Sequence, residues 1–163
     1  VELSTGSLGH GFPYGVGIAM AKKHSGDSGR VFVLMSDGEC NEGTTWESSL
    51  IANSFSLNNL LVIIDRNRLQ SITWTEETLP LEPLSNKWDS FGFETTVIDG
   101  HNHNELEEAI SKIQVKPKVI IAETLKGKGV SFMENENIWH YKFPVGANFD
   151  MAINEVRDAN NFR

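Results

Sequence analysis

Residues 31–38 read VFVLMSDG, an apolar run of strand-forming residues that ends in a polar turn. Two further short apolar runs follow, at 60–64 and 119–122, and helical patterns separate the three. Runs of this kind are typical of parallel strands that are buried on both faces. We therefore predict a doubly wound α/β domain, with a mainly parallel sheet and helices on both of its faces. Ligands of such a domain bind at the carboxyl ends of the strands.

The remaining elements are placed around these runs. We predict strands at 30–35, 60–65, 94–99 and 118–123. A Gly-rich loop at 6–11 opens a helix that reaches about His24, and a second helix is expected over 45–55. Residues 66–87 read as a long loop, 130–141 as a loop with room for a short helix, and the tail beyond Phe143 gives no prediction.

The helix between the last two strands carries its own signals. We expect Asn104 to cap it, because Glu107 follows three residues later in the spacing of a capping box. Apolar residues then recur at helical spacing and would face the core. They are Leu106, Ala109, Ile110 and Ile113.

Composition indicates one domain and limits its partners. The chain has 163 residues, 39% of them hydrophobic and 22% charged, which suits a single globular core. A formal net charge of -8 gives nucleic acid and anionic membranes no general attraction. The apolar runs are far shorter than the roughly 20 residues that span a bilayer. We expect neither a nucleic-acid nor a membrane partner.

Two features bear on the cell compartment and on the extent of the chain. Cys40 is the only cysteine, so no disulfide forms within the chain, which fits a cytoplasmic protein. The chain begins at Val1 rather than at Met. We expect residues 1–163 to be a single domain and a fragment that lacks an upstream segment.

Polar clusters follow two neighbouring strands of the predicted sheet. Asp37 and Gly38 come directly after the first strand, and Asn67 comes directly after the second. We therefore expect them at the same sheet edge, where carboxylate and amide oxygens suit Mg²⁺ or Ca²⁺ and where Gly38 lets a diphosphate oxygen approach the backbone. Composition alone favours a plainer explanation, in which Asp37 and Asn67 are ordinary turn residues.

Four segments, in order along the chain, resemble segments of transketolases. They are TGSLGHG at 5–11, DGECNEG at 37–43, NNL at 58–60 and KGKGV at 126–130. The stretch up to Asn67 also resembles the thiamine-diphosphate signature that opens with Gly-Asp-Gly and closes on Asn, with Ser36 in place of the first Gly. The resemblance runs from about Glu2 to His140. It is closest to the amino-terminal halves of transketolases that are split over two chains, and it implies the thiamine-diphosphate-binding fold.

This resemblance implies a role for each matching residue. It implies that Asp37 and Asn67 are metal ligands, with the main-chain carbonyl of Leu69 as a third, and that Gly38 and Glu39 bind the cofactor. The resemblance also implies that Gly6 and Leu8 line the aminopyrimidine side of the cofactor. It implies that Glu42 and Glu47 join a chain of carboxylates that links paired active sites across a dimer. His140 would lie near the diphosphate and the reacting substrate.

Plainer roles stay open for the glycines and the two glutamates. The glycines at 6–11 stand in the wrong order for a dinucleotide-binding loop, which makes that alternative weak. Glu42 and Glu47 are also suited to be solvated charges at the start of a helix, where acidic residues are favoured. Without the resemblance, the solvated role would be preferred.

The residues near the end of the chain have alternatives too. His140 has aromatic neighbours on both sides and could be a packing histidine. Lys126 and Lys128 could attract a diphosphate or a sugar phosphate, or belong to a solvated loop, and we leave them outside the site. The bulky segment 73–77 after Asn67 leaves the sugar specificity open.

The resemblance implies a transketolase-type enzyme that moves a two-carbon ketol unit between sugar phosphates. Its cofactors would be thiamine diphosphate and Mg²⁺ (or Ca²⁺), because in this family the cofactor supplies the chemistry that the protein positions. The partner would be a pyrimidine-binding chain or domain that brings the activating glutamate, in a homodimer or heterotetramer. The alternatives are a synthase that resembles deoxyxylulose-phosphate synthase, and a non-catalytic subunit that retains the fold.

Overall fold

The computed structural model describes residues 1–160 and contains one sheet of four parallel strands. The strands lie in the order β1-β2-β4-β3. They are β1 (Val31–Ser36), β2 (Leu60–Arg66), β3 (Glu94–Asp99) and β4 (Lys118–Glu123). All four predicted strands are confirmed, to within one residue at each end. The central strands β2 and β4 are buried along most of their length, whereas β1 alternates between buried and exposed residues, as expected of an edge strand.

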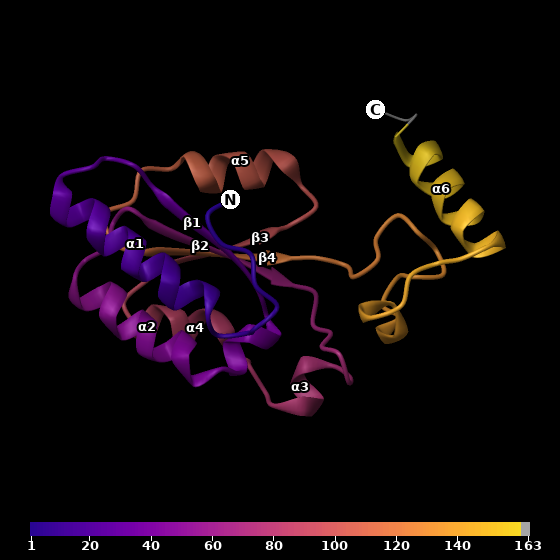
Figure 1. Cartoon of the computed structure of the whole chain (residues 1–163), viewed down its shortest axis with the longest axis horizontal. Coiled ribbons are helices and arrows are strands. Elements are labelled where there is room, and N and C mark those ends of the chain that lie inside the picture. The colour runs from indigo at the N-terminus through magenta and orange to yellow at the C-terminus, as the bar shows by residue number, and fades with distance from the viewer. Residues whose placement is uncertain (161–163) are drawn as a thin grey trace.

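Helices cover both faces of the sheet, which confirms the doubly wound architecture. Figure 1 shows α1 (Gly11–Ser25), α2 (Gly43–Ser54) and α4 (Leu84–Ser90) on one side and α5 (His103–Ser111) on the other. The larger hydrophobic core lies between the sheet and helices α1, α2 and α4, and a smaller one lies between the sheet and α5. On the α5 side, edge strand β1 leaves Phe32 and Leu34 exposed.

Aromatic side chains organise the larger core. Phe12 of α1 and Trp88 of α4 are fully buried, and their ring centroids lie 5.9 Å apart in an edge arrangement. Phe93, just before β3, packs edge-on against Trp88 with its centroid 4.9 Å away. Such pairs stabilise the fold beyond the burial of the rings. The core thus joins the first helix to the helix that ends the loop after β2.

The cap of α5 corrects one prediction. Asn102, and not Asn104, is the N-cap: its side chain accepts hydrogen bonds from the N–H groups of Asn104 and Glu105. Asn102 Nδ2 also donates to Glu105 Oε1 at 2.8 Å. The capping-box spacing was right, but it occurs two residues earlier than predicted. Asn102 has the extended backbone that an N-cap needs, whereas Asn104 already lies in the first turn.

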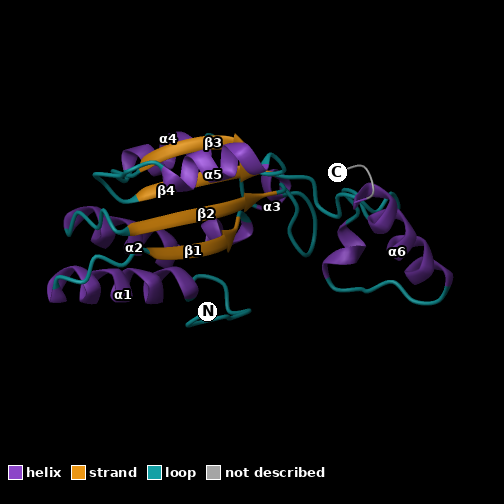
Figure 2. Cartoon of the chain, turned by 90° about the horizontal axis from the view of Figure 1, so that it is seen from above, coloured by secondary structure: helices purple, strands orange, loops and turns teal. Residues whose placement is uncertain are grey.

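Residues 66–87 and the tail beyond Phe143, for which no helix was predicted, both contain helical residues. Residues 66–87 hold α3 (Thr75–Thr78) and the start of α4, so they are not a plain loop. Beyond Phe143 the chain forms α6 (Ala147–Asn160), which stands beyond the carboxyl ends of the strands (Figure 2). A 3-10 helix, η2 (Asn137–His140), lies where a short helix was expected. Within residues 1–160 no helix is long and apolar enough to cross a membrane.

Candidate functional site

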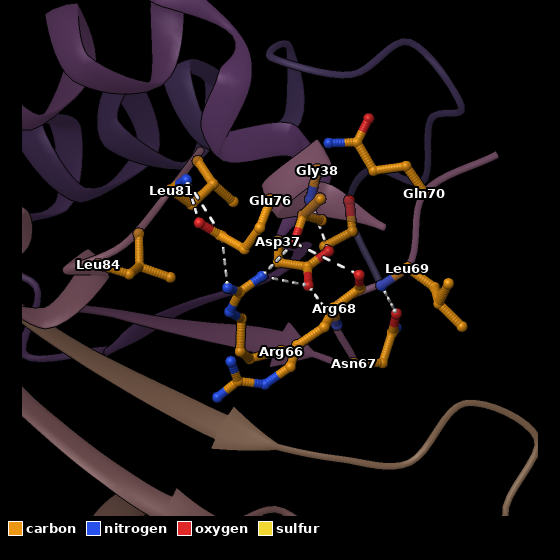
Figure 3. A network of polar contacts seen from close by, with 12 residues as sticks. Asp37, Gly38, Arg66, Asn67, Arg68, Leu69, Gln70, Glu76, Leu81 and Leu84 are labelled. Carbon is orange, nitrogen blue, oxygen red and sulfur yellow. Dashed lines mark hydrogen bonds and ion pairs between the residues drawn. The ribbon is translucent and has the colours of Figure 1, made fainter. Parts of the chain in front are cut away.

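The carboxyl ends of β1 and β2 bring the two polar clusters together. Ser36 is the register partner of Asp65, and the main-chain N–H of Asp37 donates to the Asp65 carbonyl at 3.2 Å. Asp37 and Asn67 therefore leave the sheet from adjacent strands at one edge, as predicted. Figure 3 shows the corner that they share.

The Asp37 carboxylate is buried and accepts three hydrogen bonds. Gly38 N donates to Oδ1 at 2.7 Å, while Arg68 N and Arg66 Nη1 donate to Oδ2 at 2.7 and 3.0 Å. Burial raises the pKa of the Asp37 carboxyl, and these bonds act in the opposite direction. An ionised carboxylate offers about four lone-pair sites. The site that stays free lies on Oδ1, and it can take a further ligand.

Asn67 and Leu69 form a tight turn directly after β2. Leu69 N donates to Asn67 Oδ1 at 3.0 Å, and Arg68 between them adopts a left-handed φ of 67°. Asn67 is therefore a turn residue, and the turn lies beside Asp37, because Arg68 N within it donates to Asp37 Oδ2 (Figure 3).

The chemistry of this corner fits a divalent cation. A carboxylate, an amide oxygen and a main-chain carbonyl are hard oxygen donors, the kind that Mg²⁺ and Ca²⁺ prefer. These three proposed ligands include a single carboxylate. Among the described residues, no group of three or more His, Cys, Asp or Glu side chains is placed to hold a metal ion. Mg²⁺ commonly takes few protein ligands when phosphate oxygens complete its shell.

Arg66 belongs to this corner, although no role was predicted for its side chain. Its guanidinium is buried and binds Asp37, Glu76 and Glu82. Burial disfavours its charge, but the bonds to Glu82, Asp37 and Glu76 outweigh this effect and raise the pKa of Arg66. One signal was available in the sequence: a charged residue ends a strand that is otherwise apolar, just before Asn67.

The Gly-rich loop is attached to the same end of the sheet through Glu39. Gly9 N donates to Glu39 Oε1 at 3.0 Å, and Thr44 Oγ1 donates to the Gly9 carbonyl at 2.6 Å. Burial raises the pKa of the Glu39 carboxyl. Gly6 and Leu8, on the free part of this loop, are exposed. Glu39 thus has a structural bond to the loop in addition to the cofactor contact predicted for it.

The two glutamates that follow are exposed. Glu42 is the N-cap residue of α2, but its side chain makes no capping hydrogen bond, and Glu47 lies on the outer side of the same helix. This exposure agrees with solvated charges and equally with a contact to a partner. Within this chain, Glu42 also packs beside Gly9.

His140 lies at the end of η2, and its ring is paired with Lys126. His140 Nδ1 is 3.4 Å from Lys126 Nζ. Partial burial, and then the positive charge of Lys126, lower the pKa of His140. His140 is exposed, so it is not a buried packing histidine, and the aromatic contact next to it involves Trp139 and Phe132. A hydrogen bond of 3.2 Å from Asn137 Nδ2 to the Ser71 carbonyl ties this segment to the loop that carries Asn67.

This arrangement defines a class of domain. A parallel α/β sheet that gathers a carboxylate, an amide oxygen and a glycine turn at the ends of adjacent strands is suited to a phosphate ligand that carries a metal. Residues 1–149 match the family model described as the transketolase, thiamine diphosphate binding domain. The chain belongs to the transketolase family.

Named relatives include subunits of transketolases. The chain is 42% identical over 160 residues to a subunit of the apulose-4-phosphate transketolase of Actinobacillus succinogenes, and the match covers 97% of this chain and 58% of that protein. It is 38% identical over 143 residues to the SqwG subunit of the 6-deoxy-6-sulfo-D-fructose transketolase of a Clostridium species, with 86% and 52% covered. The chain thus spans little more than half the length of these relatives.

A solved structure agrees with the fold over almost the whole chain. A crystal structure of transketolase from Campylobacter jejuni superposes with a TM-score of 0.88 at 28% identity, and the match covers 99% of this chain and 26% of that one. The predicted fold class and the predicted family are both confirmed.

Proposed function

We propose that this chain supplies the metal and diphosphate half of a transketolase-type active site. The cofactors would be thiamine diphosphate and Mg²⁺ (or Ca²⁺), and the reaction would move a two-carbon ketol unit between sugar phosphates. The observation that carries the proposal is that Asp37 and the turn of Asn67 and Leu69 follow the adjacent strands β1 and β2, and that Arg68 N within this turn donates to Asp37 Oδ2. Family membership supports the cofactor.

Asp37, Asn67 and the main-chain carbonyl of Leu69 would hold the metal ion. Gly38 would lie against the diphosphate, since a residue without a side chain lets a diphosphate oxygen approach the backbone closely. When bound, thiamine diphosphate supplies the carbanion-stabilising chemistry. The residues of this chain would fix the position of its charged end.

The Gly-rich loop would line the aminopyrimidine side of the cofactor. Gly6 and Leu8 are the residues proposed for this contact, and the exposure of both supports it. Glu39 would act at the same place, since its carboxylate holds Gly9 and thereby sets where the loop lies. Cofactor binding and loop position would then be connected through one buried side chain.

The site would be completed by a pyrimidine-binding chain or domain. Both relatives named above are described as subunits of transketolases, which supports a partner chain. We propose a homodimer or heterotetramer that works in the cytoplasm. Glu42 and Glu47 would face the partner and join a chain of carboxylates between paired sites. Both side chains are exposed and therefore accessible to a partner.

His140 would act near the diphosphate and the sugar substrate. Its neighbour Lys126 adds a positive charge that suits a phosphate group. The substrate class is a phosphorylated or otherwise anionic ketose, in line with the sugars in the names of the relatives. The imidazole and the ammonium would bind and orient that substrate.

Calorimetry tests the proposal directly. The full-length protein with its pyrimidine-binding partner should bind thiamine diphosphate only in the presence of Mg²⁺. We expect Asp37→Ala and Asn67→Ala each to weaken this binding. Asp27→Ala is the matched control, because it removes a carboxylate that pairs with Lys22 away from the site. Unchanged binding in the first two variants would refute the metal assignment, and product analysis with candidate ketoses tests the transfer reaction.

A further inference from the structure

One guanidinium in this chain binds three carboxylates. Arg66 ends β2, and only 1% of its side chain is exposed. Nη1 donates to Asp37 Oδ2 at 3.0 Å, and Nη2 donates to Glu76 Oε1 and to Glu82 Oε1, both at 2.8 Å. Figure 3 shows Asp37 and Glu76 on the same guanidinium. These four side chains are called the Arg66 cluster below.

The outer carboxylates of the Arg66 cluster hold the far end of the loop after β2. Both oxygens of Glu76 accept a hydrogen bond from Leu81 N, at 3.1 and 3.2 Å. Glu82 Oε2 accepts one from Leu84 N, at the first residue of α4, at 2.9 Å. Arg66 therefore connects the residue at which the loop begins to the residues at which it ends.

The contact of Arg66 with Asp37 determines which carboxylate oxygen can bind a metal ion at the proposed site. Arg66 and the N–H of Arg68 together occupy Asp37 Oδ2, which leaves Oδ1 as the oxygen with a free site. A second bond, from Nη1 to Thr75 Oγ1 at 2.6 Å, holds the loop just past the Asn67 turn. The same guanidinium thus restrains the carboxylate ligand and the loop that carries the other two ligands.

We propose that Arg66 is a positioning residue for the metal site, and that Glu76 and Glu82 set the metal affinity through it without touching the metal. This inference rests on the proposed function. Partners that orient metal ligands commonly contribute about 10- to 100-fold to affinity. Arg is suited to the task because its planar fork can bind several carboxylates at fixed angles, which the single ammonium of Lys cannot do.

A purely electrostatic role for the cluster makes a different prediction. The positive charge of Arg66 close to Asp37 opposes the approach of a divalent cation. If charge alone mattered, Arg66→Lys would leave the affinity unchanged, because it keeps the charge. If positioning matters, the same variant weakens binding, because it loses the fork. Arg66→Lys therefore separates the two effects.

The experiment measures Mg²⁺ affinity by calorimetry, in the presence of thiamine diphosphate and the partner chain. The variants are Arg66→Lys and the double variant Glu76→Ala with Glu82→Ala. Glu77→Ala is the matched control, because Glu77 lies in the same short helix and contacts Thr73 instead of Arg66. Hydrogen exchange of residues 67–83, measured without metal, gives a readout that does not depend on activity.

We expect about tenfold weaker Mg²⁺ binding and faster exchange in both cluster variants, and less than about a twofold change in Glu77→Ala. Wild-type affinity in Arg66→Lys would overturn the positioning role while leaving the proposed function intact, provided that Asp37→Ala still loses binding. Failure of the wild-type protein to bind Mg²⁺ with the cofactor would overturn the proposed function itself. If Arg66→Lys does not fold, metal-free hydrogen exchange of residues 67–83 in the double variant decides, since the side chains of Glu76 and Glu82 are 36% and 45% exposed; wild-type exchange there would overturn the positioning role.

Discussion

Replacement of Gly9 by Ala tests how the Gly-rich loop is fixed to the sheet. Gly9 has a left-handed φ of 76°, and an added Cβ would lie 2.5 Å from Thr44 Oγ1 and 2.8 Å from Glu42 Cβ. A left-handed non-glycine residue costs about 1–3 kcal/mol, and overpacking costs about 1–3 kcal/mol more. The lower backbone entropy of Ala in the unfolded chain offsets about 0.4–1 kcal/mol. We therefore expect the free energy of unfolding to fall by about 1–5 kcal/mol, with a central value of about 3 kcal/mol.

Urea denaturation, followed by far-UV circular dichroism, measures this loss. With a urea dependence of about 1–3 kcal/mol per molar, the midpoint should fall by about 1–2 M. Gly6→Ala is the matched control: an added Cβ there meets no atom within 4 Å, so its midpoint should stay the same or rise slightly. A loss below about 1 kcal/mol in Gly9→Ala, or an equal loss in Gly6→Ala, would refute the steric argument.

Three further measurements test other parts of the structure. Trp88→Ala should lower the free energy of unfolding, measured in urea, by about 3–5 kcal/mol, because Trp88 is fully buried between aromatic rings. The control Trp74→Ala changes a side chain that is 40% exposed and should cost only about 0.5 kcal/mol. Equal losses in the two variants would contradict this view of the core. Partial burial and the charge of Lys126 lower the pKa of His140, so the His140 ring stays neutral to a lower pH than usual. Lys126→Ala should therefore raise the pH midpoint of the His140 titration followed by NMR. An unmoved or lowered midpoint would rule out the pairing of His140 with Lys126. Burial raises the pKa of the Cys40 thiol to about 12, so iodoacetamide at neutral pH should label it only after unfolding, and rapid labelling of the folded protein would show that the thiol is accessible.

The strands were predictable because each one carries its own physical signal. Val31–Ser36 and Leu60–Arg66 are short apolar runs flanked by turns. Runs of this kind are typical of buried parallel strands, so each strand could be predicted from its local sequence alone. Their shared edge then followed from the topology, which is why Asp37 and Asn67 could be placed together before any contact was known.

The misses involve signals that are short or that depend on distant partners. Helix α4 has only seven residues, and the burial of Trp88 within it depends on α1, so sequence periodicity could not reveal it. At α5, two Asn-x-x-Glu patterns overlap, and their spacing alone does not distinguish Asn102 from Asn104 as the cap. The bonds of Arg66 to Asp37 and Glu82 join residues 29 and 16 positions away along the chain, and no local pattern records such pairs.

The central claim is that Asp37, Asn67 and Leu69 hold a divalent metal at the ends of β1 and β2. Anomalous diffraction from crystals grown with Mn²⁺, thiamine diphosphate and the partner chain tests it most directly. We predict a metal peak roughly 2.0–2.2 Å from Asp37 Oδ1, from the Asn67 amide oxygen and from the Leu69 carbonyl. A peak bound by other residues, with this corner empty of metal, would contradict the account.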